Sequence, residues 1–148
     1  MEKVTIVPNG DKELLYFYKE IVLYYEKEVK GKQTGFNSRL RFFAKFVNEQ
    51  KIHFVLFENR QIEMPNQYKN DHYSFIHFKQ TNNHSRFASF LFHARNCFAH
   101  GRFSKVRIGN QIYLCMEDIN NRGNYSMVAQ IPIRQFPALL ELIKQSRK

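Results

Sequence analysis

Residues 84–117, "HSRFASFLFHARNCFAHGRFSKVRIGNQIYLCME", contain the change of pattern that decides the predicted fold. Nine of the fifteen residues from Arg86 to His100 are apolar, and Gly101 is a natural C-terminal stop for a helix. After this glycine, "KVRIGNQIYLCME" (105–117) has two β-prone runs around Gly109-Asn110, which is a hairpin signal. We therefore expect a helix over roughly 84–100, followed by a β-hairpin.

The segments on either side mostly predict helices. Asn9-Gly10-Asp11 is typical of a helix start with Asp11 as the N-cap, and Gly31 is the expected stop of that helix. Asn37 or Ser38 is the expected cap of a second helix, and residues 134–148 have the pattern of a final amphipathic helix. The apolar residues of these three patterns are Leu14, Tyr18, Ile21, Val22, Tyr25 and Val29, then Leu40, Phe43, Phe46 and Val47, then Phe136, Leu139, Leu140 and Ile143.

Three further segments have extended character. "IHFVLF" (52–57) is too short to distinguish a helix continuation from a buried strand. Residues 59–83 predict a long irregular connection with a short extended piece at "YSFIHF" (73–78), and "YSMVAQIPI" (125–133) is a candidate third strand after the hairpin. The fold class expected for the single domain, 1–148, is mainly α, with a hairpin or three-stranded addition before the last helix.

The charge of the chain is large and unevenly distributed. The net charge is +10, and residues 75–148 contain eleven Lys or Arg but three Asp or Glu. No acidic residue occurs from His72 to Met116, in the region of the motif helix, so we expect RNA or another polyanion as the partner. Cys97 and Cys115 form neither a disulfide framework nor a zinc pattern. Without a membrane-length apolar run or a signal sequence, the expected localisation is cytoplasmic.

The polar residues of the motif helix gather on one side of it. At about 100° per residue, Arg86, Ser89, His93, Asn96 and His100 fall within an arc of roughly 80°, and Arg95 lies about 140° from His100. Apolar residues occupy nearly all the rest of the circumference, which indicates burial on more than one side. A second copy of the chain is a candidate for part of that cover, with the polar stripe facing a cleft between protomers.

The residue types of the stripe suit phosphate chemistry. His100 can exchange a proton near neutral pH, and the planar guanidinium of Arg95 suits a phosphate. Asn96, one turn before His100, can orient either group. No paired carboxylates and no third ligand beside His93 and His100 are evident, so we expect neither a metal nor another cofactor. The alternative is structural: Arg95 and His100 cap the helix end and do nothing more.

The segment "RNCFAHG" (95–101) resembles the signature of the HEPN domains (higher eukaryotes and prokaryotes nucleotide-binding). Arg95, Asn96 and His100 match its Arg, its polar residue and its His, with four residues between Arg and His. The resemblance covers the motif firmly, residues 84–148 in outline, and the first half only as compatible helices. The three-stranded addition departs from the family pattern.

The resemblance implies a helical bundle that dimerises around the two motif helices. It also implies a metal-independent endoribonuclease in which Arg95, Asn96 and His100 are catalytic and the RNA 2′-hydroxyl attacks, with a toxin–antitoxin or phage-defence role. A homodimer and an antitoxin or nucleotidyltransferase partner follow from the same resemblance. The stripe and the charge add His93, Arg86, Arg102 and Lys105 as substrate-binding residues. The alternative function is a non-catalytic HEPN-like module that binds RNA or nucleotide, or only dimerises.

Overall fold

The computed structural model of the chain describes residues 3–31, 36, 40–81 and 84–147. Its described part contains one six-stranded sheet in the order β1-β4-β5-β6-β3-β2, in which only the β2–β3 pair is parallel. The strands are β1 (Val4–Val7), β2 (Ile52–Phe57), β3 (Ser74–Lys79), β4 (Phe103–Ile108), β5 (Gln111–Ile119) and β6 (Tyr125–Pro132). The helices are α1 (Asp11–Phe17), α2 (Arg41–Glu49), α3 (Arg86–Ala99) and α4 (Phe136–Gln145).

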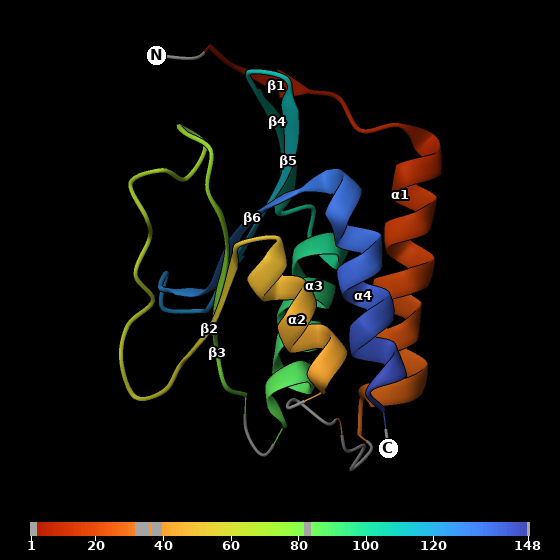
Figure 1. Ribbon diagram of the computed structural model, residues 1–148. Helices are drawn as coiled ribbons and strands as arrows, with labels where there is room; N and C mark the ends of the chain where they lie inside the picture. The colour runs from red at the N-terminus through yellow and green to blue at the C-terminus, as the bar shows by residue number, and fades with distance from the viewer. Residues whose placement is uncertain (1–2, 32–35, 37–39, 82–83, 148) are drawn as a thin grey trace.

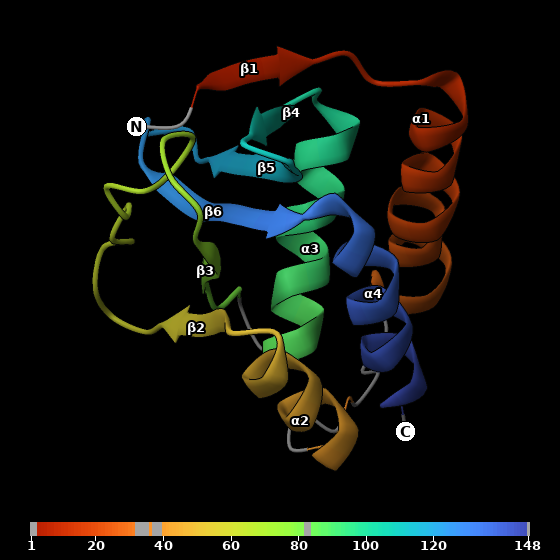
Figure 2. The same ribbon diagram turned by 45° about the horizontal axis from the view of Figure 1, so that its top comes forward.

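The helices cover one face of this sheet (Figures 1 and 2). The N-terminal helix continues past α1 as two π-helical stretches, η1 (Tyr18–Leu23) and η2 (Tyr25–Val29), and a short 3₁₀ turn, η3 (Ile133–Gln135), precedes α4. The main core lies between this helical layer and the sheet and is rich in phenylalanine rings. A smaller apolar cluster occupies the opposite face, where the connection 58–73 runs along the sheet (Figure 1).

The expected helical bundle is wrong, because the molecule is a mixed α/β fold. The hairpin at Gly109 and the third strand are present, but they form the middle of a sheet instead of an addition to a bundle. The ambiguous segment 52–57 forms β2, which pairs in parallel with β3, and β3 lies where a short extended piece was expected at 73–78. Strand β3 continues the sheet from β6 and is a full member of it, not part of an irregular connection. Strand β1 was not expected, since four residues before Pro8 are too few to show a period.

The motif helix was predicted well. Ser85 is its N-cap, and its hydroxyl accepts a hydrogen bond from Ala88 N at 3.2 Å. At the other end Gly101 has φ +68°, a left-handed conformation that suits glycine, and Arg102 N donates to the carbonyl of Cys97 at 2.8 Å. The local sequence therefore sets both ends of α3.

The apolar circumference of α3 is covered by its own chain. The helix contacts η1 and η2 on one side and β3 and β5 on the other, and eight of its residues are buried. The burial pattern of α3 is thus met without a second copy, so the homodimer stays a prediction of the family resemblance alone. At the N-terminal helix, Gly10 is the N-cap in place of Asp11, and the two alternative caps expected at 37 and 38 lie outside the described residues.

Candidate functional site

A polar cavity of about 520 Å³ opens beside the C-terminal half of α3. Strands β3 and β5 are both antiparallel to β6, so they run in the same direction and their C-terminal ends lie on the same side of the sheet. The cavity lies at these strand ends, where the loop after β5 and the start of β6 also meet. Its lining comprises Lys79, Gln80, Thr81, Phe92, His93, Asn96, His100, Arg102, Asp118, Ile119, Asn120, Asn121 and Ser126.

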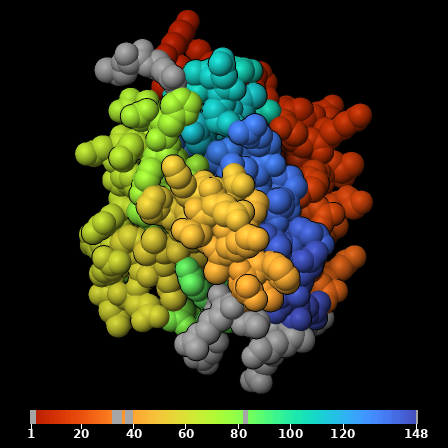
Figure 3. Space-filling model, in the orientation of Figure 1, coloured from red at the N-terminus to blue at the C-terminus, as the bar shows by residue number. Residues whose placement is uncertain are grey.

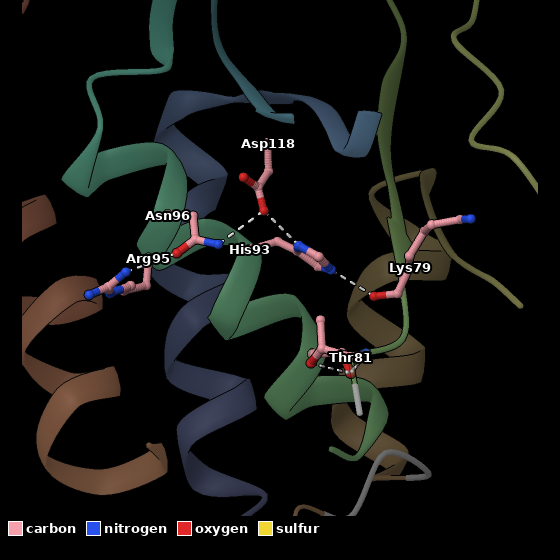
Figure 4. A network of polar contacts seen from close by, with 7 residues as sticks. Lys79, Thr81, His93, Arg95, Asn96 and Asp118 are labelled. Atoms are coloured by element: carbon pink, nitrogen blue, oxygen red, sulfur yellow. Dashed lines mark hydrogen bonds and ion pairs between the residues drawn. The ribbon is translucent and has the colours of Figure 1, made fainter. Parts of the chain in front are cut away.

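Asp118 is the centre of the polar network beside this cavity (Figure 4). On β5 the side chains of Leu114 and Met116 belong to the core beneath the helices, and alternation along the strand places Asp118 on the same face. One carboxylate oxygen, Oδ2, accepts from His93 Nδ1 at 2.8 Å and from Asn96 Nδ2 at 3.2 Å. The pairing register of β5 shifts beside this residue, a local irregularity that redirects side chains at a strand end.

His93 is a buried connector between three elements. Its side chain is 3% exposed; Nδ1 faces Asp118 Oδ2 on β5, and Nε2 lies 2.7 Å from the carbonyl oxygen of Lys79 at the end of β3. Both ring nitrogens therefore lie against oxygen atoms of the protein itself. His93 was expected to bind substrate, but its two ring nitrogens are engaged within the protein, and its role in this structure is to join α3 to the sheet.

Arg95 turns away from the cavity toward the N-terminal helix (Figure 4). Its Nε and NH2 lie 2.8 Å and 2.7 Å from Glu26 Oε1, and its NH1 donates to Asn96 Oδ1 at 2.9 Å. The hydrogen bonds from Arg95, together with Lys30, lower the pKa of Glu26. Asn96 therefore links Arg95 to Asp118, and two of the three motif residues are held by protein partners.

His100 and Arg102 are the exposed cationic or ionisable side chains at the C-terminal end of α3. Both residues are exposed, both line the cavity, and within the described part of the chain no hydrogen bond or ion pair joins either side chain. Arg102 also borders a neighbouring cavity of about 240 Å³, which Lys69 and Glu117 line as well. An imidazole and a guanidinium without protein partners are available here for an anionic ligand.

The other two expected binding residues lie elsewhere. Arg86 is at the opposite end of α3, where it lines a cavity beside α2 and β2. Lys105 is buried on β4, and its ammonium forms an ion pair of 2.5 Å with Glu13 of α1. Hydrogen bonds from Gly10 and Lys105 lower the pKa of Glu13, although burial acts in the opposite direction. The structure thus brings together His93, Asn96, His100 and Arg102, and separates Arg86 and Lys105 from them.

Sequence reasoning missed Asp118 and Glu26. Asp118 had a readable signal, since it continues the alternation of Leu114 and Met116 and so places a carboxylate on the core face of a strand. Glu26 had none, because it lies 69 residues before the arginine that it binds. Among the described residues, no group of three His, Cys, Asp or Glu is arranged to hold a metal ion, and no helix has the length and apolarity needed to cross a membrane.

Comparisons with protein-family models, with curated proteins and with solved structures gave no match to this chain.

Proposed function

We propose that the chain binds RNA through the cavity at the C-terminal end of α3. The observation that carries the proposal is the pair of exposed side chains, His100 and Arg102, which border the cavity and have no partner in the part of the chain that the structure describes. A guanidinium binds phosphate oxygens through two parallel hydrogen bonds, and an imidazole donates to or accepts from a neighbouring oxygen. The amide side chains of Asn120 and Asn121 add uncharged donors and acceptors for sugar and base.

The charge distribution supports a polyanion over a neutral ligand. Lys79 and Arg102 line the cavity, and its one carboxylate, Asp118, already accepts hydrogen bonds from His93 and Asn96. The sequence from His72 to Met116, which supplies most of the lining, contains no acidic residue. Phosphates would therefore meet a field that is positive and little opposed.

Binding is tested by fluorescence anisotropy with a labelled single-stranded RNA at two salt concentrations. We expect Arg102→Gln to weaken binding and to reduce the slope of log K against log salt by about one, the signature of one lost phosphate contact. Arg107→Gln is the matched control, because Arg107 is an exposed arginine of β4 that does not line the cavity. Equal affinity and equal slope for wild type and Arg102→Gln would show that RNA does not bind here.

A second candidate function is metal-independent cleavage of that RNA, and the unpartnered imidazole of His100 favours it. His100 would take the proton of the ribose 2′-hydroxyl as this oxygen attacks phosphorus. The bond from phosphorus to the 5′-oxygen then breaks, which leaves a 2′,3′-cyclic phosphate, and the departing 5′-oxygen takes a proton from water to become a hydroxyl. The family motif assigns the phosphate to Arg95, whereas the ion pair of Arg95 with Glu26 favours Arg102 for this role.

Cleavage is tested by incubating structured RNA with the chain in EDTA and analysing the ends of the products. If His100 is the general base, we expect His100→Ala to lose cleavage, and Arg102→Gln to lose more of the cleavage rate than Arg95→Gln. Cleavage that persists in His100→Ala, or that needs an added metal, would refute the mechanism and leave the binding proposal standing. A homodimer and an antitoxin or nucleotidyltransferase partner stay predictions of the family resemblance, and light scattering after size exclusion checks the first.

A further inference from the structure

A second polar cavity, of about 480 Å³, lies at the opposite end of α3, where α2 leads into the edge strand β2. Figure 3 shows α2, in orange, at the surface beside the yellow and green segments that follow it in the chain. The lining comprises Val47, Asn48, Lys51, Ile52, His53, Phe54 and Arg86. It contains two cationic side chains, an imidazole and an amide, and no carboxylate.

Arg86 is a half-buried cation that has no carboxylate partner among the described residues. Its NH2 donates to the carbonyl oxygen of Phe54 at 2.7 Å, and its guanidinium lies 4.9 Å from the centre of the Phe54 ring. Its Nε is buried and has no hydrogen-bond acceptor among the described residues. Burial lowers the pKa of this guanidinium, and no neighbouring charge opposes the effect.

A partly buried charge without a counter-ion costs free energy, so its presence requires an explanation. Of the residues outside the described ranges, only Glu2 is acidic, so the sequence leaves little else to neutralise Arg86. Two other cations with little exposure, Lys105 and Lys144, each meet a carboxylate. Arg86 is thus held by the carbonyl and ring of Phe54, and an anion from outside the chain would supply the counter-charge.

The rest of the lining fits a phosphate and a flat ring. Lys51 adds a second positive charge at the turn from α2 into β2, where it adopts φ +55°, a conformation that costs a non-glycine residue some strain. His53 is exposed on β2, and its ring centroid lies 5.0 Å from that of Tyr73 on the neighbouring strand segment, with 36° between the ring planes. Because Phe54 faces the helices, alternation along β2 turns His53 and the adjacent Tyr73 ring to the opposite face, so a base would stack on them around the edge of this strand.

We propose that this cavity binds a nucleotide, with the phosphate between Arg86 and Lys51 and the base on the ring of His53. The site is separate from the His100 cavity, because the fourteen residues of α3 span about 21 Å. The inference does not rest on RNA binding or cleavage at the other end of the helix. It assigns to Arg86 a ligand that the His100 cavity does not reach.

The test is calorimetric titration of the whole chain with adenosine 5′-monophosphate, ribose 5-phosphate and inorganic phosphate. We expect all three to bind, with the nucleotide tightest because only it carries a base. Lys51→Gln and Arg86→Met should each weaken nucleotide binding about tenfold or more, as for loss of a charge-assisted contact. Lys45→Gln, a change of an exposed lysine on α2 outside the cavity lining, is the control and should bind like wild type.

Thermal melting of Arg86→Met separates loss of the ligand contact from loss of the fold. Because the mutation removes a charge that has no counter-ion, the melting temperature without ligand should stay within about 3 °C of wild type, while the stabilisation by nucleotide disappears. Equal affinity for nucleotide and ribose 5-phosphate would overturn the stacking of the base on His53. No binding of any probe, or binding abolished by Arg102→Gln and not by Arg86→Met or Lys51→Gln, would overturn the site itself.

Discussion

Removal of the Asp118 carboxylate is expected to destabilise the fold strongly. Asp118 is 7% exposed, and its Oδ2 is the acceptor for both His93 Nδ1 and Asn96 Nδ2. Asp118→Ala leaves the buried His93 and the half-buried Asn96 without this acceptor, and an unsatisfied buried donor costs about 1–3 kcal/mol. The free energy of unfolding should therefore fall by about 2–4 kcal/mol, most of it from His93, which lowers the melting temperature of a chain of this size by about 4–16 °C.

Asp118→Asn distinguishes the loss of the hydrogen bonds from the loss of the negative charge. Because both hydrogen bonds reach the same oxygen, the amide oxygen of Asp118→Asn can accept both and lose only the charge, at a cost of about 1–2 kcal/mol. Urea denaturation followed by circular dichroism gives both values, with Glu58→Ala as an exposed control that should change stability by less than about 0.5 kcal/mol. If Ala and Asn cost the same, or if Ala costs less than about 1 kcal/mol, the network does not hold α3 to the sheet.

Three further predictions concern buried ionisable groups. Burial lowers the pKa of His77, so below about pH 6.5 the folded chain binds fewer protons than the unfolded chain. The free energy of unfolding should therefore be highest above that pH and fall on acidification, and the fall should be smaller in His77→Gln. Urea midpoints measured from about pH 7.5 to about pH 5 check this. Burial raises the pKa of the Cys97 thiol and raises that of Cys115 to about 12. At pH 8 neither thiol should therefore react with a disulfide reagent faster than the chain opens, and rapid labelling of the folded protein would contradict this. Glu13→Gln leaves the buried ammonium of Lys105 without its carboxylate and should lower the free energy of unfolding by about 2 kcal/mol. Lys105→Met removes the buried charge itself and should lower it by less than about 1 kcal/mol. The reverse order in urea denaturation would refute the reasoning.

Local patterns predicted those elements whose signals lie within one short segment. The helix over 84–100 was readable from its apolar content and its glycine stop, and it extends from Arg86 to Ala99 with Ser85 as cap. The hairpin at Gly109 and the strand from Tyr125 were readable for the same reason. The segment 52–57 was not, because its six residues, five of them apolar, fit a buried strand and a helix turn equally well, and only its pairing with β3 decides between them.

The helical bundle that the family resemblance implied is the wrong architecture. A motif of Arg, Asn and His over six residues identifies the polar side chains near the end of a helix. It carries no information on which elements pack around that helix. In this chain the surroundings of α3 include a sheet of six described strands, and two of the helix neighbours are β3 and β5. The expected bundle failed because sheet order depends on contacts between distant segments, such as β1 with β4, which no local period encodes.

The sequence by itself determined α3, its two ends, the hairpin that follows and the positive charge of the region around them, because these depend on neighbouring residues. Only the tertiary structure decided which polar side chains remain free. It paired Arg95 with Glu26 across 69 residues and His93 with Asp118 across 25, leaving His100 and Arg102 exposed at one end of α3 and Arg86 without a carboxylate at the other. Hydrogen bonds are made by atoms close in space, and for groups so far apart along the chain the fold alone brings them together.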